Sequence, residues 1–197
     1  MKLSYIGAAL LALAAASGAS ATPVVSGLGA GQSFQQYSGT APVGNGHVNT
    51  DNVLWFVDEL AVNSLKSWFI FFDPSSSQAI SATLVFDSPI VDVIIDRAGL
   101  FQSHGVYGVD IDQDGNFNDY QHAARTGLEG VQDGVVWTPG SQTLQLRWTA
   151  ENPGDHIRVL TGASSLTALN VPEPASWGLA GVALAALVGA RLRRRKS

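Results

Sequence analysis

The chain has no cysteine among its 197 residues. Without cysteine no disulfide can stabilise the fold, even in an oxidising compartment that would allow one. Zinc sites built on cysteine are excluded for the same reason. The stability of the fold must therefore come from an apolar core, with a metal bound by oxygen ligands as a further source.

Positive charge is scarce between residues 22 and 170. This region holds five Lys and Arg against 15 Asp and Glu, a net charge of −10, whereas the last 27 residues carry a net +4. Nucleic acid needs a basic footprint on its partner, so nucleic acid is excluded as a partner. The acidic balance instead suits cations and keeps a secreted protein soluble.

Familiar catalytic motifs are also missing. There is no Gly-x-Ser-x-Gly elbow of a serine hydrolase. Carboxylate pairs such as Asp58–Glu59 or Asp92 with Asp96 could serve a glycosidase, but with 15 acidic residues such pairs arise by chance. The histidines show no paired zinc spacing and are predicted to be surface or turn residues: His47, His104, His122 and His156.

Both ends of the chain differ from its middle. Lys2 precedes an apolar stretch at residues 6–16, and Ala19-Ser20-Ala21 provides a small-residue cleavage site. This pattern predicts a secretory signal peptide at residues 1–21. Residues 22–170 then remain as one domain, long enough for a sizeable core.

The C-terminal residues 171–197 form three blocks. Pro172-Glu173-Pro174 comes first, and its prolines cannot lie inside a helix. An uncharged apolar run follows at residues 175–190, at the short end of the roughly 17–25 residues that span a bilayer as a helix. The last block is a basic cluster that would stay on the cytoplasmic side, and it contains Arg191, Arg193, Arg194 and Arg195.

This three-block tail resembles the PEP-CTERM sorting signal. The resemblance implies recognition and processing by an exosortase, an integral-membrane enzyme of Gram-negative bacteria that make extracellular polysaccharide. It predicts export, a transient anchor in the inner membrane through the C-terminal helix, and a final place outside the cell or on its surface. The alternative for the tail is an ordinary single-span anchor.

The middle of the chain reads as β-strands. Apolar runs rich in aromatic and β-branched residues lie at 53–57, 68–72, 80–86 and 90–95, and later strands are expected at 106–111, 135–138, 143–148 and 156–160. Residues 22–52 suit an irregular arm or short edge strands, and no convincing amphipathic helix is found. Short strands about ten residues apart predict an all-β, jelly-roll-like β-sandwich.

One loop has the pattern of a calcium site. Residues 110–121 begin with D-x-D-x-D-G, and calcium takes six to eight hard oxygens from such alternate residues. Gly115 would form the sharp turn and Phe117 would pin the loop to the core. The predicted ligands are Asp110, Asp112, Asp114, Asn116, Asn118 and Asp119.

The loop also departs from an EF-hand. Gln121 stands where an EF-hand has a bidentate Glu, and a strand rather than a helix is expected before the loop. Asp119, or a carboxylate from elsewhere such as Glu129 or Asp133, would complete the shell. The alternative is a solvated acidic turn, because Asp-Gly and Asn-Asp are also ordinary turn formers.

These observations favour a non-catalytic protein of the extracellular matrix or cell surface, with calcium as a stabilising ion. A carbohydrate-binding module of the exopolysaccharide matrix is the alternative, and a secreted glycan-active hydrolase is a further one. Tryptophans could form a sugar-stacking platform, although in strands they more often belong to the core; they are Trp55, Trp68, Trp137 and Trp148.

Overall fold

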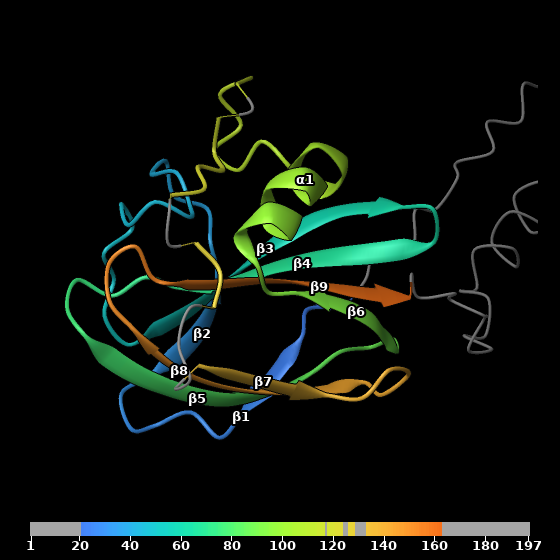
Figure 1. Ribbon diagram of the computed structural model, residues 1–197, viewed down its shortest axis with the longest axis horizontal. Coiled ribbons are helices and arrows are strands. Elements are labelled where there is room, and N and C mark those ends of the chain that lie inside the picture. Colours follow the sequence, from blue (N-terminus) through green and yellow to red (C-terminus); the bar gives the residue numbers. More distant parts are fainter. Residues whose placement is uncertain (1–20, 117, 124–125, 129–132, 163–197) are drawn as a thin grey trace, which may run out of the picture. The chain divides into compact units, whose positions relative to one another are not determined.

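The computed structural model describes residues 21–116, 118–123, 126–128 and 133–162. Nine strands form two sheets in these residues, and one helix, α1, lies against the larger sheet (Figure 1). The all-β sandwich predicted from the sequence is confirmed. The sorting tail and the domain boundary at residue 170 lie outside the described residues, and so does the predicted signal peptide apart from Ala21. Within the described ranges, no helix is long and apolar enough to cross a membrane.

The smaller sheet has four antiparallel strands in the order β1-β5-β8-β7. Its strands are β1 (Val24–Ser26), β5 (Gln78–Val85), β8 (Thr143–Ala150) and β7 (Gly134–Trp137). Strict alternation of buried and exposed residues along β8 confirms the pattern expected there, since successive side chains of a strand point to opposite faces.

The larger sheet has five strands in the order β2-β3-β4-β9-β6. Its members are β2 (Ser33–Gln36), β3 (Val53–Val62), β4 (Leu65–Phe72), β9 (Asp155–Gly162) and β6 (Ile90–Ile94). β2 runs parallel to β3 and the other neighbours are antiparallel. The Gly-rich segment 22–52 thus supplies one short edge strand to each sheet.

The space between the sheets holds the main core. Trp68, Ile70 and Phe72 of β4 point into it and meet residues of β5 and β8, including Leu84 and Trp148. The alternate residues of β4, Phe69 and Phe71, are also fully buried, but in a second cluster on the outer face of the larger sheet. Burial on both faces explains why β4 is a continuous apolar run.

Helix α1 (Arg97–Tyr107) covers part of that outer face. The sequence predicted a strand at residues 106–111 and no helix, and both predictions are wrong. The Asp96 side chain caps the helix by accepting a hydrogen bond from the Gly99 N–H at 2.9 Å. Gly99 and Gly105 make the segment a poor helix former, so its helical state depends on packing that a local pattern does not reveal.

A buried ion pair lies beneath α1. Arg158 of β9 and Glu59 of β3 are joined by two hydrogen bonds of 2.7 Å, and both side chains are 0% exposed. Arg158 Nη1 also donates to the Leu100 carbonyl at 3.0 Å and to the Ser103 hydroxyl, both in α1. Ser67 of β4 donates to Glu59 Oε2 at 2.5 Å. One polar network therefore connects three strands to the helix.

Candidate functional site

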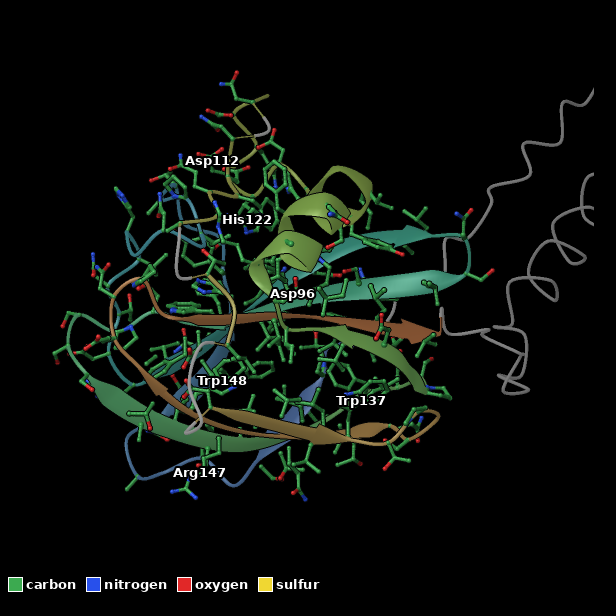
Figure 2. All side chains as sticks on the ribbon, viewed as in Figure 1. Asp96, Asp112, His122, Trp137, Arg147 and Trp148 are labelled. Atoms are coloured by element: carbon green, nitrogen blue, oxygen red, sulfur yellow. The ribbon has the colours of Figure 1, made fainter. Side chains whose placement is uncertain are left out.

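The acidic loop follows α1 and brings three of the predicted ligands together. Asp110, Asp112 and Asp119 each offer a carboxylate oxygen, and these oxygens all lie within 4.8 Å of one another. Asp112 lies on the same side of the larger sheet as α1, whereas Arg147 and Trp137 lie toward the smaller sheet (Figure 2). Among the described residues, no other group of three acidic or histidine side chains could hold a metal ion in this way.

Backbone N–H groups fix the three carboxylates. Asp119 Oδ2 accepts from the Ile111 N–H at 2.8 Å, and Asp110 Oδ2 accepts from the Gly115 N–H at 2.8 Å. Asp112 Oδ1 accepts from the Asp114 N–H at 3.2 Å. Gly115 has φ +86°, the left-handed conformation that glycine adopts without strain, so the sharp turn expected there is present.

A second chain segment holds the far end of the loop. Val43 forms a parallel bridge with Tyr120, in which its N–H donates to the Asp119 carbonyl at 2.7 Å. Gly44 continues the contact with φ +86°, and a Cβ at this position would lie 2.6 Å from the Gln121 carbonyl oxygen. Only glycine allows this close approach, which places Asp119 at the base of the loop.

The electrostatics of the triad suit a cation. Burial raises the pKa of the Asp119 carboxyl, and the negative charges of Asp112, Asp110 and Asp114 raise it further. Asp110 Oδ1 is buried and has no hydrogen-bond partner among the described residues. A hard divalent ion would offset the repulsion between these carboxylates and would give Asp110 Oδ1 a partner.

The remaining predicted ligands are not members of this group of three carboxylates. Asp114 is exposed and both of its oxygens accept from Asn116, which lowers the pKa of Asp114. Asn116 and Asn118 are exposed. Gln121 Oε1 accepts from Asn45 at 2.6 Å. Of the distant carboxylates considered, Asp133 accepts from the Thr149 N–H at 2.8 Å, while Glu129 and Phe117 lie outside the described residues.

His156 is fully buried in β9, so the prediction that the histidines are surface or turn residues is wrong for His156, whereas His104 and His122 are half-buried. His156 on β9 is 0% exposed and stacks on Phe71 with ring centroids 5.8 Å apart. His104 of α1 lies 4.6 Å from Tyr120 and 6.1 Å from His122, centroid to centroid. Their positions depend on the helix and on long-range strand pairing, neither of which the spacing of the histidines reveals.

Burial lowers the pKa of each of these histidines. Burial lowers the pKa of His156 to about 3, with a smaller contribution from His122. The pKa of His122 falls to about 4 through burial, and then through repulsion by Arg158, His104 and Arg97. The pKa of His104 is lowered by burial first and by Arg158 second.

The tryptophans do not form one exposed line among the described residues. Trp68 and Trp148 are 1% and 0% exposed and belong to the core. Trp137 packs against the edge of that core, and Trp55 lies on the opposite face of the larger sheet. Three of the four carboxylates in the considered pairs have structural partners: Asp58 pairs with Lys66, Glu59 pairs with Arg158, and Asp96 caps α1. The fourth, Asp92, is exposed and accepts from the neighbouring Val93 N–H.

Comparison with known protein families matches residues 170–195 to the PEP-CTERM protein-sorting motif. The chain carries a PEP-CTERM sorting signal. This motif implies export and processing by an exosortase, in agreement with the three-block tail. No curated protein and no solved structure matches the chain. The residues that form the PEP-CTERM signal, from Pro172 to Arg195, lie outside the described part of the structure.

We predict that replacing His156 by Leu makes the PEP-CTERM protein less sensitive to acid. Folded His156 has a pKa of about 3, against about 6.5 in an unfolded chain. Above pH 6.5 both states are neutral. As the pH falls below 6.5, the unfolded state binds a proton that the folded state does not, and the free energy of unfolding falls until about pH 3.

Between pH 8 and pH 5 the unmodified protein should therefore lose about 2 kcal/mol relative to His156→Leu. Urea unfolding of residues 22–170 at both pH values measures this difference. The comparison isolates His156 because both proteins share every other titrating group. The exposed His47, replaced by Leu, provides a matched control. A difference between His156→Leu and the unmodified protein that stays constant from pH 8 to pH 5 would contradict the prediction.

Proposed function

We propose that the β-sandwich acts without catalysis in the extracellular matrix or at the cell surface after exosortase processing. The observation that carries this proposal is the PEP-CTERM signal at residues 170–195. In the proposed route, the apolar run at residues 175–190 anchors the chain briefly in the inner membrane, and the basic cluster stays on the cytoplasmic side. The structural partners of the acidic side chains support a non-catalytic role, because a catalytic carboxylate pair must face a substrate.

We further propose calcium as a stabilising ion of the domain. Asp110, Asp112 and Asp119 would provide its carboxylate ligands, with the remaining positions filled by water or loop carbonyls. Three hard oxygen donors around one point fit calcium, and the donor set offers no soft ligand that a zinc or copper site would use. Binding would neutralise the charge gathered around buried Asp119 and so stabilise the loop.

The sorting route can be tested by fusing residues 171–197 to an unrelated exported reporter. We expect cleavage of the reporter only in cells that contain a compatible exosortase. The matched control replaces Pro172, Glu173 and Pro174 by Ala and keeps the apolar run and the basic cluster. This control should remain uncleaved in the membrane, because an anchor alone does not provide the recognition motif. Equal processing of both fusions, or processing without the exosortase, would refute the route.

The calcium proposal predicts a calcium-dependent melting temperature for residues 22–170. Extracellular calcium modules typically have Kd values of about 10⁻⁴–10⁻³ M. With calcium tenfold above Kd, binding to the folded state alone adds about 1.4 kcal/mol, which raises Tm by a few degrees in a domain of this size. The melt is recorded in millimolar calcium, in magnesium and in chelator.

Asp112→Ala should abolish the calcium shift, because it removes an oxygen ligand whose hydrogen bond, from the Asp114 N–H, lies within the loop. Asp92→Ala, which removes an exposed charge on β6, is the matched control and should keep the shift. Magnesium should stabilise less, since it demands a tighter octahedral shell. The same Tm in calcium and in chelator would leave the loop as a solvated acidic turn.

A further inference from the structure

A polar hollow of about 500 Å³ opens beside the edge of the larger sheet. Residues 35–41 line it together with Val48, Thr50 and Trp55. We call it the Trp55 hollow. Its volume falls within the roughly 300–1,000 Å³ of small-molecule sites, which combine an aromatic wall with a few placed polar groups.

The fold holds the hollow's aromatic wall in place. Gln35 of β2 lies directly beside Trp55 of β3 in the parallel register, so both side chains point to the same face. The Trp55 ring is stacked on Phe71 at 6.5 Å and meets the edge of Tyr37 at 5.4 Å, centroid to centroid. Tyr37 in turn donates from its hydroxyl to the Ala41 carbonyl at 2.7 Å, which closes the 37–41 turn. The wall therefore needs little reorganisation to receive a ligand.

The chemistry of the lining is that of a saccharide site. An indole offers an apolar surface on which the C–H face of a sugar ring can pack. Side-chain amides and hydroxyls around it can pair with sugar hydroxyls, because each group both donates and accepts. These groups belong to Gln35, Gln36, Ser38, Thr40 and Thr50.

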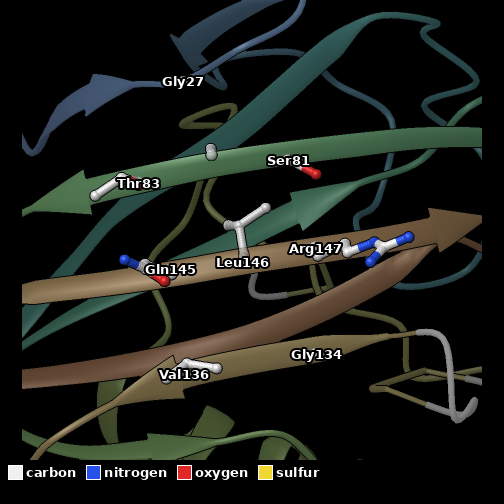
Figure 3. Close-up of a pocket in the computed structure, with 9 residues that line it drawn as sticks. Gly27, Ser81, Thr83, Gly134, Val136, Gln145, Leu146 and Arg147 are labelled. Atoms are coloured by element: carbon white, nitrogen blue, oxygen red, sulfur yellow. The ribbon is translucent and has the colours of Figure 1, made fainter.

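The charge of the lining residues favours neutral saccharides over acidic ones. None of the residues that line the Trp55 hollow is charged. A smaller adjoining hollow shares Gln36, Tyr37 and Ser38 with it and is lined by Asp58 and Asp110. Asp58 is paired with Lys66, so in the calcium-free protein the negative charge of Asp110 is the one that disfavours uronates and sulfated sugars. A third hollow, on the smaller sheet, contains Arg147, Gln145 and Ser81 but has no aromatic lining (Figure 3).

We propose that the Trp55 hollow binds a neutral saccharide, with Trp55 as the stacking surface and Gln35 among the hydrogen-bonding groups. The biological setting of this site rests on the proposed matrix role. Binding is measured with purified protein in chelator, so the result depends on neither sorting nor calcium, and failure of this proposal can be distinguished from failure of the proposed function.

The test is calorimetric titration of the full chain with neutral β-1,4- and α-1,4-linked glucose hexasaccharides and with a hexagalacturonate. The protein is kept in a detergent without a sugar headgroup, which would compete for the site. We expect saturable binding of at least one neutral hexasaccharide and at least tenfold weaker binding of the hexagalacturonate. Trp55→Ala should weaken neutral binding at least tenfold, because it removes the stacking surface.

Two variants protect the test from effects on folding. Gln35→Ala changes an exposed side chain of an edge strand and should weaken binding severalfold at an unchanged Tm. Trp137→Ala, which removes a partly exposed indole from the other sheet, should leave binding unchanged. The proposal is overturned if neither neutral hexasaccharide binds. It is also overturned if Trp55→Ala and Gln35→Ala bind as the unmodified protein does, or if the hexagalacturonate binds as tightly.

Discussion

The ion pair between Arg158 and Glu59 connects the sandwich to everything that lies on its outer face. Two buried charges are costly unless each is fully hydrogen-bonded, and here the bonds come from strands β3, β4 and β9 and from α1. Removing one partner of such a pair typically costs about 3–5 kcal/mol. The position of α1, and with it that of His104 and of the acidic loop that follows the helix, therefore depends on this one ion pair.

Local sequence patterns predicted the strands well because burial on one or both faces leaves a direct trace. The alternation of β8 and the continuous apolar run of β4 each match the observed environment. Helix α1 was not predicted because its formation depends on the packing of Leu100 and on hydrogen bonds from Arg158, which is 58 residues from Leu100 in the chain. Gly99 and Gly105 argue against a helix when the segment is taken alone.

The candidate sites likewise combine features that follow from local sequence with features that depend on long-range contacts. The D-x-D-x-D-G spacing located the acidic loop, and the fold brings Asp110 and Asp112 together with Asp119. Asp114 is not one of the three gathered carboxylates, and both of its oxygens accept hydrogen bonds from Asn116; Asn116 and Asn118 are exposed. The Trp55 hollow could not be read from the sequence, since it needs the parallel pairing of β2 with β3.

Amide hydrogen exchange in Arg158→Met tests most directly whether the buried pair holds the outer layer. We predict that residues 97–107 and the 108–121 loop exchange at least about tenfold faster than in the unmodified protein, since α1 loses its bonds to Arg158 and Tyr120 loses the contact of its ring with the Arg158 guanidinium. Strands β5 and β8, which face the other side of the core, should keep their protection. Unchanged protection of α1, or an equal loss across the whole domain, would contradict the account.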